Sequence, residues 1–71
     1  MKPGDLVIVT ITNYLMLHHT VKSVRTFDPP PREITRGSIG IILSPPQGTW
    51  INWMVNGQVG WSNQVFLEEL P

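Results

Sequence analysis

Seventy-one residues are enough for one small domain, and they include no cysteine, which excludes disulfides, thiolate metal sites and cysteine nucleophiles. Five basic and five acidic residues give a formal net charge of zero, so no strong positive field is available to attract a nucleic-acid backbone. The longest apolar run, Leu6–Val9, is far shorter than the roughly 20 residues of a membrane helix, and no signal-peptide pattern follows Met1, so we expect a soluble, unprocessed chain.

One strand is predicted on each side of a long middle segment. The first covers residues 5–12, which are rich in β-branched side chains and follow the turn signal Pro3-Gly4. The second covers residues 36–43 and ends at Pro45-Pro46, because proline cannot donate a hydrogen bond to a neighbouring strand.

A β-hairpin is the strongest local signal in the sequence. Trp50–Val55 and Gln58–Ser62 flank Asn56-Gly57, the dipeptide best suited to a two-residue type I′ turn, in which both positions need a positive φ. Counting outward from this turn places Trp53 opposite Gly60, where the missing side chain would leave room for the indole. The same counting pairs Val55 with Gln58, Met54 with Val59, and Asn52 with Trp61.

The C-terminal part predicts a fifth strand. Residues 65–70 are suited to a short closing strand, and Asn63-Gln64 before them to a single helical turn or a tight bend. Five strands therefore come from residues 1–12 and 37–71, and the predicted fold class is all-β.

Residues 13–36 form a long excursion after the first strand. This segment, called the arm below, holds both histidines and the run Pro29-Pro30-Pro31, and it shows no helical periodicity. Residues 20–27 could form a ribbon strand. Adjacent His18 and His19 on an extended segment would point to opposite sides, so no metal site or other cofactor is predicted.

Three segments together carry a resemblance to a known family. Residues 2–7 (Lys-Pro-Gly-Asp-Leu-Val), residues 37–42 (Gly-Ser-Ile-Gly-Ile-Ile) and residues 60–68, which begin Gly-Trp, resemble the small single-domain SH3-like proteins of tailed bacteriophages, cyanophages among them. The resemblance implies a five-stranded SH3-like barrel over residues 1–71, built from 1–12 and 37–71, with the arm inserted. Proteins of this family are mostly virion accessories or of unassigned role, so the resemblance implies one of these two roles.

The sequence departs from the SH3 domains that bind polyproline peptides. Asn63 occupies the position of their closing-turn proline, Phe66 replaces a tyrosine whose hydroxyl helps to hold the peptide, and the arm is basic where theirs is acidic. Polyproline binding in the standard groove is therefore disfavoured.

A stripe of large side chains on the hairpin is the main candidate surface. Trp53 is assigned to the core, whereas Trp50, Asn52, Met54, Val59 and Trp61 share the other face. Such a stripe is either covered by the arm or forms an interface with a partner. The candidate interface residues are Trp50, Met54, Trp61, Phe66, Leu15, Leu17, Arg25 and Arg32.

Four basic residues gather in the arm: Lys22, Arg25, Arg32 and Arg36. Interruption by acidic residues favours a solvated arm, with contact to an acidic protein surface or to nucleic acid as the alternatives. No membrane contact is expected.

Enzymatic activity is not predicted. The adjacent Glu68 and Glu69 are not placed across a cleft, as general acid–base catalysis would need. Residues 4–7 and 41–45 also resemble the ribonuclease toxins of toxin–antitoxin pairs, but Ser38 stands where those toxins carry an arginine.

The sequence thus predicts a non-enzymatic protein-interaction module, phage-encoded, acting in the virion or the host cytoplasm. The alternative is a host-directed phage factor that binds a bacterial protein or nucleic acid. The partner is a protein, either another virion or host component or a second copy of the chain. Self-assembly by exchange of the arm is slightly favoured, because Pro29-Pro30-Pro31 stiffens its return path.

Overall fold

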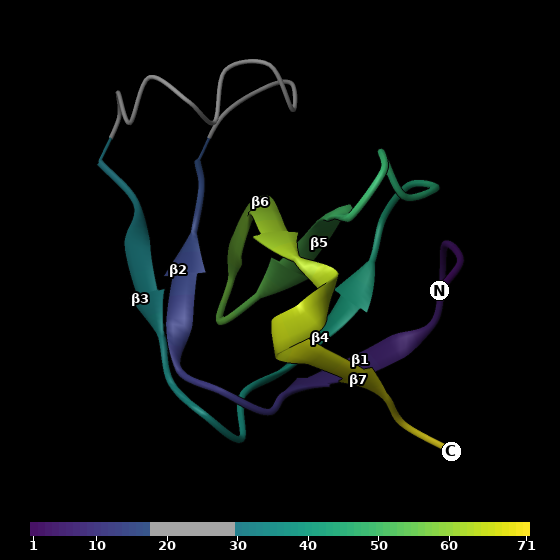
Figure 1. The fold of residues 1–71 in the computed structure, drawn as a ribbon, viewed down its shortest axis with the longest axis horizontal. Helices are drawn as coiled ribbons and strands as arrows, with labels where there is room; N and C mark the ends of the chain where they lie inside the picture. The colour runs from purple at the N-terminus through teal and green to yellow at the C-terminus, as the bar shows by residue number, and fades with distance from the viewer. Residues whose placement is uncertain (18–29) are drawn as a thin grey trace.

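The computed structural model describes residues 1–17 and 30–71, and in these residues the chain is all-β with one short 3-10 helix. A curled, antiparallel, five-stranded sheet has the strand order β6-β5-β4-β1-β7 and forms a half-barrel, and a separate two-stranded ribbon pairs β2 with β3 (Figure 1). The strands are β1 (Leu6–Val9), β2 (Asn13–Leu15), β3 (Arg32–Ile34), β4 (Ile39–Ile42), β5 (Trp50–Val55), β6 (Gln58–Asn63) and β7 (Leu67–Glu69), and the 3-10 helix is η2 (Gln64–Phe66). The predicted fold class, a small SH3-like barrel, is confirmed.

The five strands of the sheet lie where the sequence predicts them, although most are shorter. Residues 5–12 yield β1, residues 36–43 yield β4, and residues 65–70 yield β7. The single helical turn expected at residues 63–64 is η2, one residue further along the chain. No helix among the described residues is long and apolar enough to span a membrane.

The β5–β6 hairpin has the predicted turn and register. Asn56 has a φ of 53° and Gly57 a φ of 75°, as a type I′ turn requires. Trp53 pairs with Gly60 across the ladder, and the other three predicted pairs are also present. This hairpin therefore fixes the register of the longest strand pair without help from the rest of the chain.

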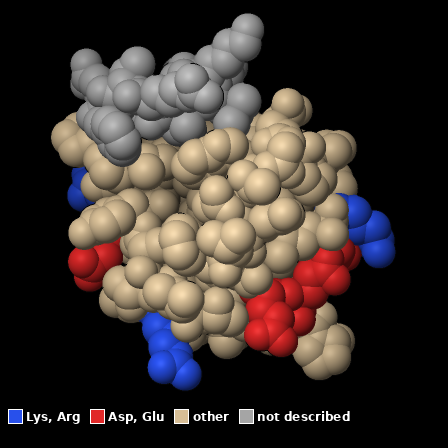
Figure 2. Space-filling view, in the orientation of Figure 1, with Lys and Arg blue, Asp and Glu red and all other residues tan. Residues whose placement is uncertain are grey.

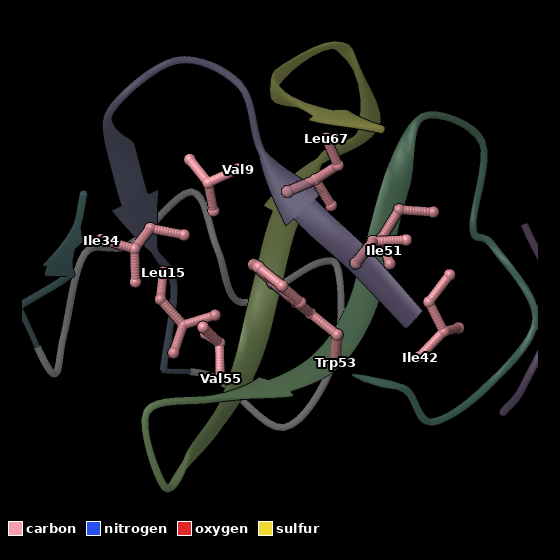
Figure 3. Packing of buried hydrophobic residues seen from close by; sticks show 9 residues of the cluster. Val9, Leu15, Ile34, Ile42, Ile51, Trp53, Val55 and Leu67 are labelled. Carbon is pink, nitrogen blue, oxygen red and sulfur yellow. The ribbon is translucent and has the colours of Figure 1, made fainter. Parts of the chain in front are cut away.

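Trp53 is the largest residue of the core and is fully buried. Its indole Nε1 donates a hydrogen bond to the Ser62 hydroxyl at 3.0 Å, so the polar atom of the ring is satisfied inside the core. Figure 3 shows side chains from both the sheet and the ribbon around this indole. The buried cluster consists of Val7, Val9, Leu15, Ile34, Ile42, Ile51, Trp53, Val55 and Leu67.

Gly40 of β4 leaves space for the Trp53 indole. A Cβ added at Gly40 would lie 2.5 Å from the Trp53 ring and would also overlap the backbone oxygen of Met54. A Cβ at Gly60 would instead meet Leu15 Cγ at 2.8 Å. The register places Gly60 opposite Trp53 as predicted, and the atoms nearest to its missing side chain belong to Leu15 and Met16, so Gly60 also lets β2 approach β6.

Both ends of the arm are part of the barrel. Leu15 of β2 and Ile34 of β3 are buried in the core, and Met16 exchanges two backbone hydrogen bonds with Trp61 of β6, at 2.8 and 2.9 Å. The predicted arm of residues 13–36 therefore begins and ends with strands that pair with each other and complete the core. The predicted ribbon strand at residues 20–27 and the two histidines lie outside the described residues.

Candidate binding groove

A groove of about 270 Å³ opens where β2, the start of β5 and η2 converge. Its walls are mainly aromatic and apolar, and its polar groups are hydroxyls and amides. The residues that line it are Thr12, Asn13, Tyr14, Met16, Trp50, Asn63 and Phe66. No charged side chain is among these described residues.

Tyr14 forms the groove wall on the ribbon side. Strand alternation turns its neighbours Asn13 and Leu15 toward the interior, which directs Tyr14 outward and leaves its side chain 53% exposed. Tyr14 pairs with Glu33 of β3. The groove wall therefore depends on the ribbon that the arm's two ends build.

Trp50 and Phe66 also line the groove, and hydrogen bonds to Thr49 link the two segments that carry them. The Asn63 side chain accepts a hydrogen bond from the Val65 amide and donates one to the Thr49 hydroxyl, each at 3.2 Å. The Gln64 amide donates to the Thr49 carbonyl at 2.8 Å. These bonds fasten the start of η2 to the residue before Trp50.

Gln47 fixes the start of β5 from the other side. It exchanges two backbone hydrogen bonds with Trp50, at 2.9 and 3.0 Å. Thr10 donates to the Phe66 carbonyl at 2.9 Å, which ties the end of η2 to β1. The Trp50 backbone is thus hydrogen-bonded through both its amide and its carbonyl, and the Phe66 backbone through its carbonyl, so both side chains start from fixed backbone, as in a pre-formed groove.

Asn13 is a buried polar residue of the groove wall, with only 7% of its surface exposed. Its Nδ2 donates to the Ile11 carbonyl at 2.7 Å, which fixes the orientation of the amide. Its Oδ1 has no hydrogen-bond partner, a condition that costs a buried carbonyl about 1–3 kcal/mol. Within the described part of the chain it is the one buried side-chain oxygen in this state.

The face of the molecule that carries η2 and the groove has few charged side chains. Residues 37–67 contain no Asp, Glu, Lys, Arg or His. Figure 2 shows the charged side chains around the periphery of the face that carries η2, with uncharged residues across its centre. Two ion pairs lie near the N-terminus: Lys2 with Asp5 at 3.7 Å, and the Met1 amino group with Glu69 at 2.7 Å.

The structure brings two of the predicted interface residues into the groove, Trp50 and Phe66. Met54 is 42% exposed on the sheet, whereas Trp61 is 6% exposed and lies beside Met16. Leu15 is a core residue, Leu17 packs against the core, Arg32 is exposed on β3, and Arg25 lies outside the described residues.

Sequence reasoning missed the ribbon side of the groove. The signal was present in Asn13–Leu15, where a tyrosine alternates with two residues that turn inward. It was not used because the strand suggested in the arm was placed at residues 20–27, and a three-residue strand has too little periodicity to identify. Asn63 was noted as a replacement for proline and as part of a turn, but not as the residue whose side chain caps η2.

Metal-site geometry is not found in residues 1–17 and 30–71, where no three His, Asp or Glu side chains cluster. Glu68 and Glu69 are exposed on β7, and neither lines the groove.

Comparisons with known proteins do not place the chain in a family. A scan against family models finds no match, and searches of curated proteins and of solved structures find no significant match.

Proposed function

We propose that the chain is a non-enzymatic protein-interaction module whose groove holds an extended, uncharged segment of a partner protein. The observation that carries the proposal is the groove itself, in which Tyr14, Trp50 and Phe66 line one opening that no charged side chain lines. Large aromatic side chains on well-ordered backbone are the usual anchors of protein–protein contacts, because they bury much area at little cost in conformational entropy.

An extended peptide fits the polar groups of the groove. Within the described part of the chain, the Trp50 indole N–H and the Tyr14 hydroxyl have no hydrogen-bond partner, so both are available to donate to backbone carbonyls of a bound segment. The neutral lining favours apolar residues in that segment, because a charged side chain would lose water without gaining an opposite charge. The same neutrality gives a nucleic-acid backbone nothing to pair with here.

The biological setting that we propose is a tailed bacteriophage, with the chain as an accessory or structural protein of the particle. The sequence resemblance of residues 2–7, 37–42 and 60–68 supports this setting. Mass spectrometry of purified particles tests it: the chain is expected at a fixed stoichiometry with the capsid proteins. A chain found only in the infected-cell lysate would favour the host-directed alternative.

Selection of peptides tests the groove directly. A displayed library of random 12-residue peptides is panned against the whole protein, and the selected synthetic peptides are measured by calorimetry. We expect apolar, uncharged peptides, with binding at least tenfold weaker to Trp50→Ala and to Phe66→Ala.

Val65→Ala is the matched control for Phe66→Ala, since Val65 is the neighbouring residue on η2, is 63% exposed and does not line the groove. It should bind the selected peptides as the unmodified protein does. Peptides that bind the unmodified protein and Trp50→Ala equally well would contradict the proposal, as would chemical-shift changes that avoid Tyr14 and Trp50.

A further inference from the structure

A row of apolar side chains crosses the outer face of the sheet, away from the core. The ladder places Leu6 of β1 opposite Ile41 of β4, Ile41 opposite Met54 of β5, and Met54 opposite Val59 of β6. Leu6, Met54 and Val59 are 51%, 42% and 52% exposed. Ile39, which lies two residues before Ile41 on β4 and on the same face, is 52% exposed. These five residues are called the outer row below, and none of them lines the groove.

The strands beneath the outer row have the composition of strands that are covered on both faces. β1 reads LVIV and β4 reads IGII, without the polar residues that alternate along a strand with one solvated face. The core covers only the inward set, Val7, Val9 and Ile42. The outward set is therefore an apolar surface of the kind that marks an interaction site.

The charge pattern indicates what covers this surface. β4, β5 and β6 carry no charged residue, so a partner that places a charge against them would bury that charge without a counter-ion. An uncharged, apolar partner face, such as the outer row itself, therefore fits β4 to β6, and the exposed Glu68 of β7, paired with Ile8, lies at the edge of this surface. The formal net charge of the chain is zero, so no long-range repulsion separates two copies.

We infer that the outer row is a self-association surface, on which a second copy of this chain packs sheet against sheet about a two-fold axis. Two such sheets would lie about 10 Å apart with their strands within roughly 30° of each other. Every contact is made twice, so a side chain near the axis meets its own copy. This arrangement differs from arm exchange, because the two ends of the arm stay on their own barrel.

The size of the surface predicts a weak dimer. Four strands spaced about 4.8 Å apart give the outer row a span of about 14 Å, along strands only four to six residues long. Such a face is smaller than the roughly 800 Å² that each partner buries in a standard stable interface. Association should therefore depend on concentration in the micromolar to millimolar range.

Sedimentation equilibrium of the whole protein between 10 µM and 1 mM is the test. We expect a reversible shift from monomer to dimer mass, and at least a tenfold weaker association for Met54→Lys and for Met54→Glu. Because Met54 lies within the row, mixing these two variants should restore association through opposite charges on facing copies. Val65→Lys is the matched control, an exposed apolar residue outside the outer row, and it should leave the dimer unchanged.

Circular dichroism of each variant establishes that the barrel is folded, as expected for changes at a solvent-exposed position. A monomer mass at 1 mM overturns the inference, and so does a dimer that forms equally well in the unmodified protein and in Met54→Lys. Trp50→Ala, which removes a groove residue, should not alter the mass, so the self-association and the peptide-binding proposals fail independently.

Discussion

The curled sheet and the β2–β3 ribbon are stabilised in different ways. In the sheet, β5 and β6 pair over six residues around a turn whose residue types dictate their own conformation. The ribbon pairs over three residues, at the two ends of a segment that separates Leu15 from Arg32, and is joined to β6 through Met16. The sheet is therefore specified by local sequence, whereas the ribbon is specified by what it buries, Leu15 and Ile34.

Removing the central indole should have the largest effect and should affect both regions. Trp53→Ala would leave a cavity where sheet and ribbon meet, and such changes cost about 3–5 kcal/mol. Since small domains are stable by only about 5–15 kcal/mol, we expect a largely unfolded chain. Far-ultraviolet circular dichroism measures this, and Met54→Ala, an exposed neighbour, is the control that should remain folded.

A substitution at Gly60 should destabilise the ribbon more than the sheet. In Gly60→Ala the added methyl group would press on Leu15 and on the Met16 carbonyl, so β2 must move away from β6, at a cost of about 1–3 kcal/mol. Amide exchange should quicken at Met16 and Tyr14 more than in β5. Equal loss of protection in both regions would mean that the ribbon and the sheet unfold as one unit.

A substitution in the hairpin turn tests the stability of the sheet in the same way. Gly57→Val places a β-branched residue at a φ of 75° and should destabilise by more than about 1 kcal/mol, which a urea melt detects. Open space surrounds Gly57, so the effect would come from the backbone alone. No change in the urea midpoint would show that the turn does not need positive φ.

The smallest expected effect lies at the base of the ribbon. The Arg36 amide donates to the Thr12 hydroxyl at 3.0 Å, a contact between segments far apart in the sequence. Thr12→Val keeps the shape and removes the acceptor, which should cost about 0.5–1.5 kcal/mol in a denaturant titration. Since Thr12 lines the groove, the selected peptides should also be measured with this variant, and a large loss of affinity would assign the hydroxyl to the ligand.

The sequence predicted the sheet well and the ribbon poorly. The β5–β6 register could be counted from Asn56-Gly57, because a two-residue turn leaves no choice of pairing. The ribbon could not be predicted, because a three-residue strand carries no sequence signal that identifies the distant strand with which it pairs. Half of the groove was missed for that reason: Trp50 and Phe66 belong to the sheet side, whereas Tyr14 depends on the ribbon.

The uncharged stretch from Gly37 to Leu67 also determines how the chain can be cut. Trypsin needs Lys or Arg, and the last such residue is Arg36, so residues 37–71 remain one fragment even when the chain is fully unfolded. Lys2 precedes a proline and resists cleavage as well. A tryptic digest therefore yields residues 37–71 as a single long peptide and shorter peptides only from the N-terminal half, so peptide counts from purified particles would under-represent this protein. Chymotrypsin, which cuts after aromatic residues such as Trp61, would recover the half that contains β4 to β7.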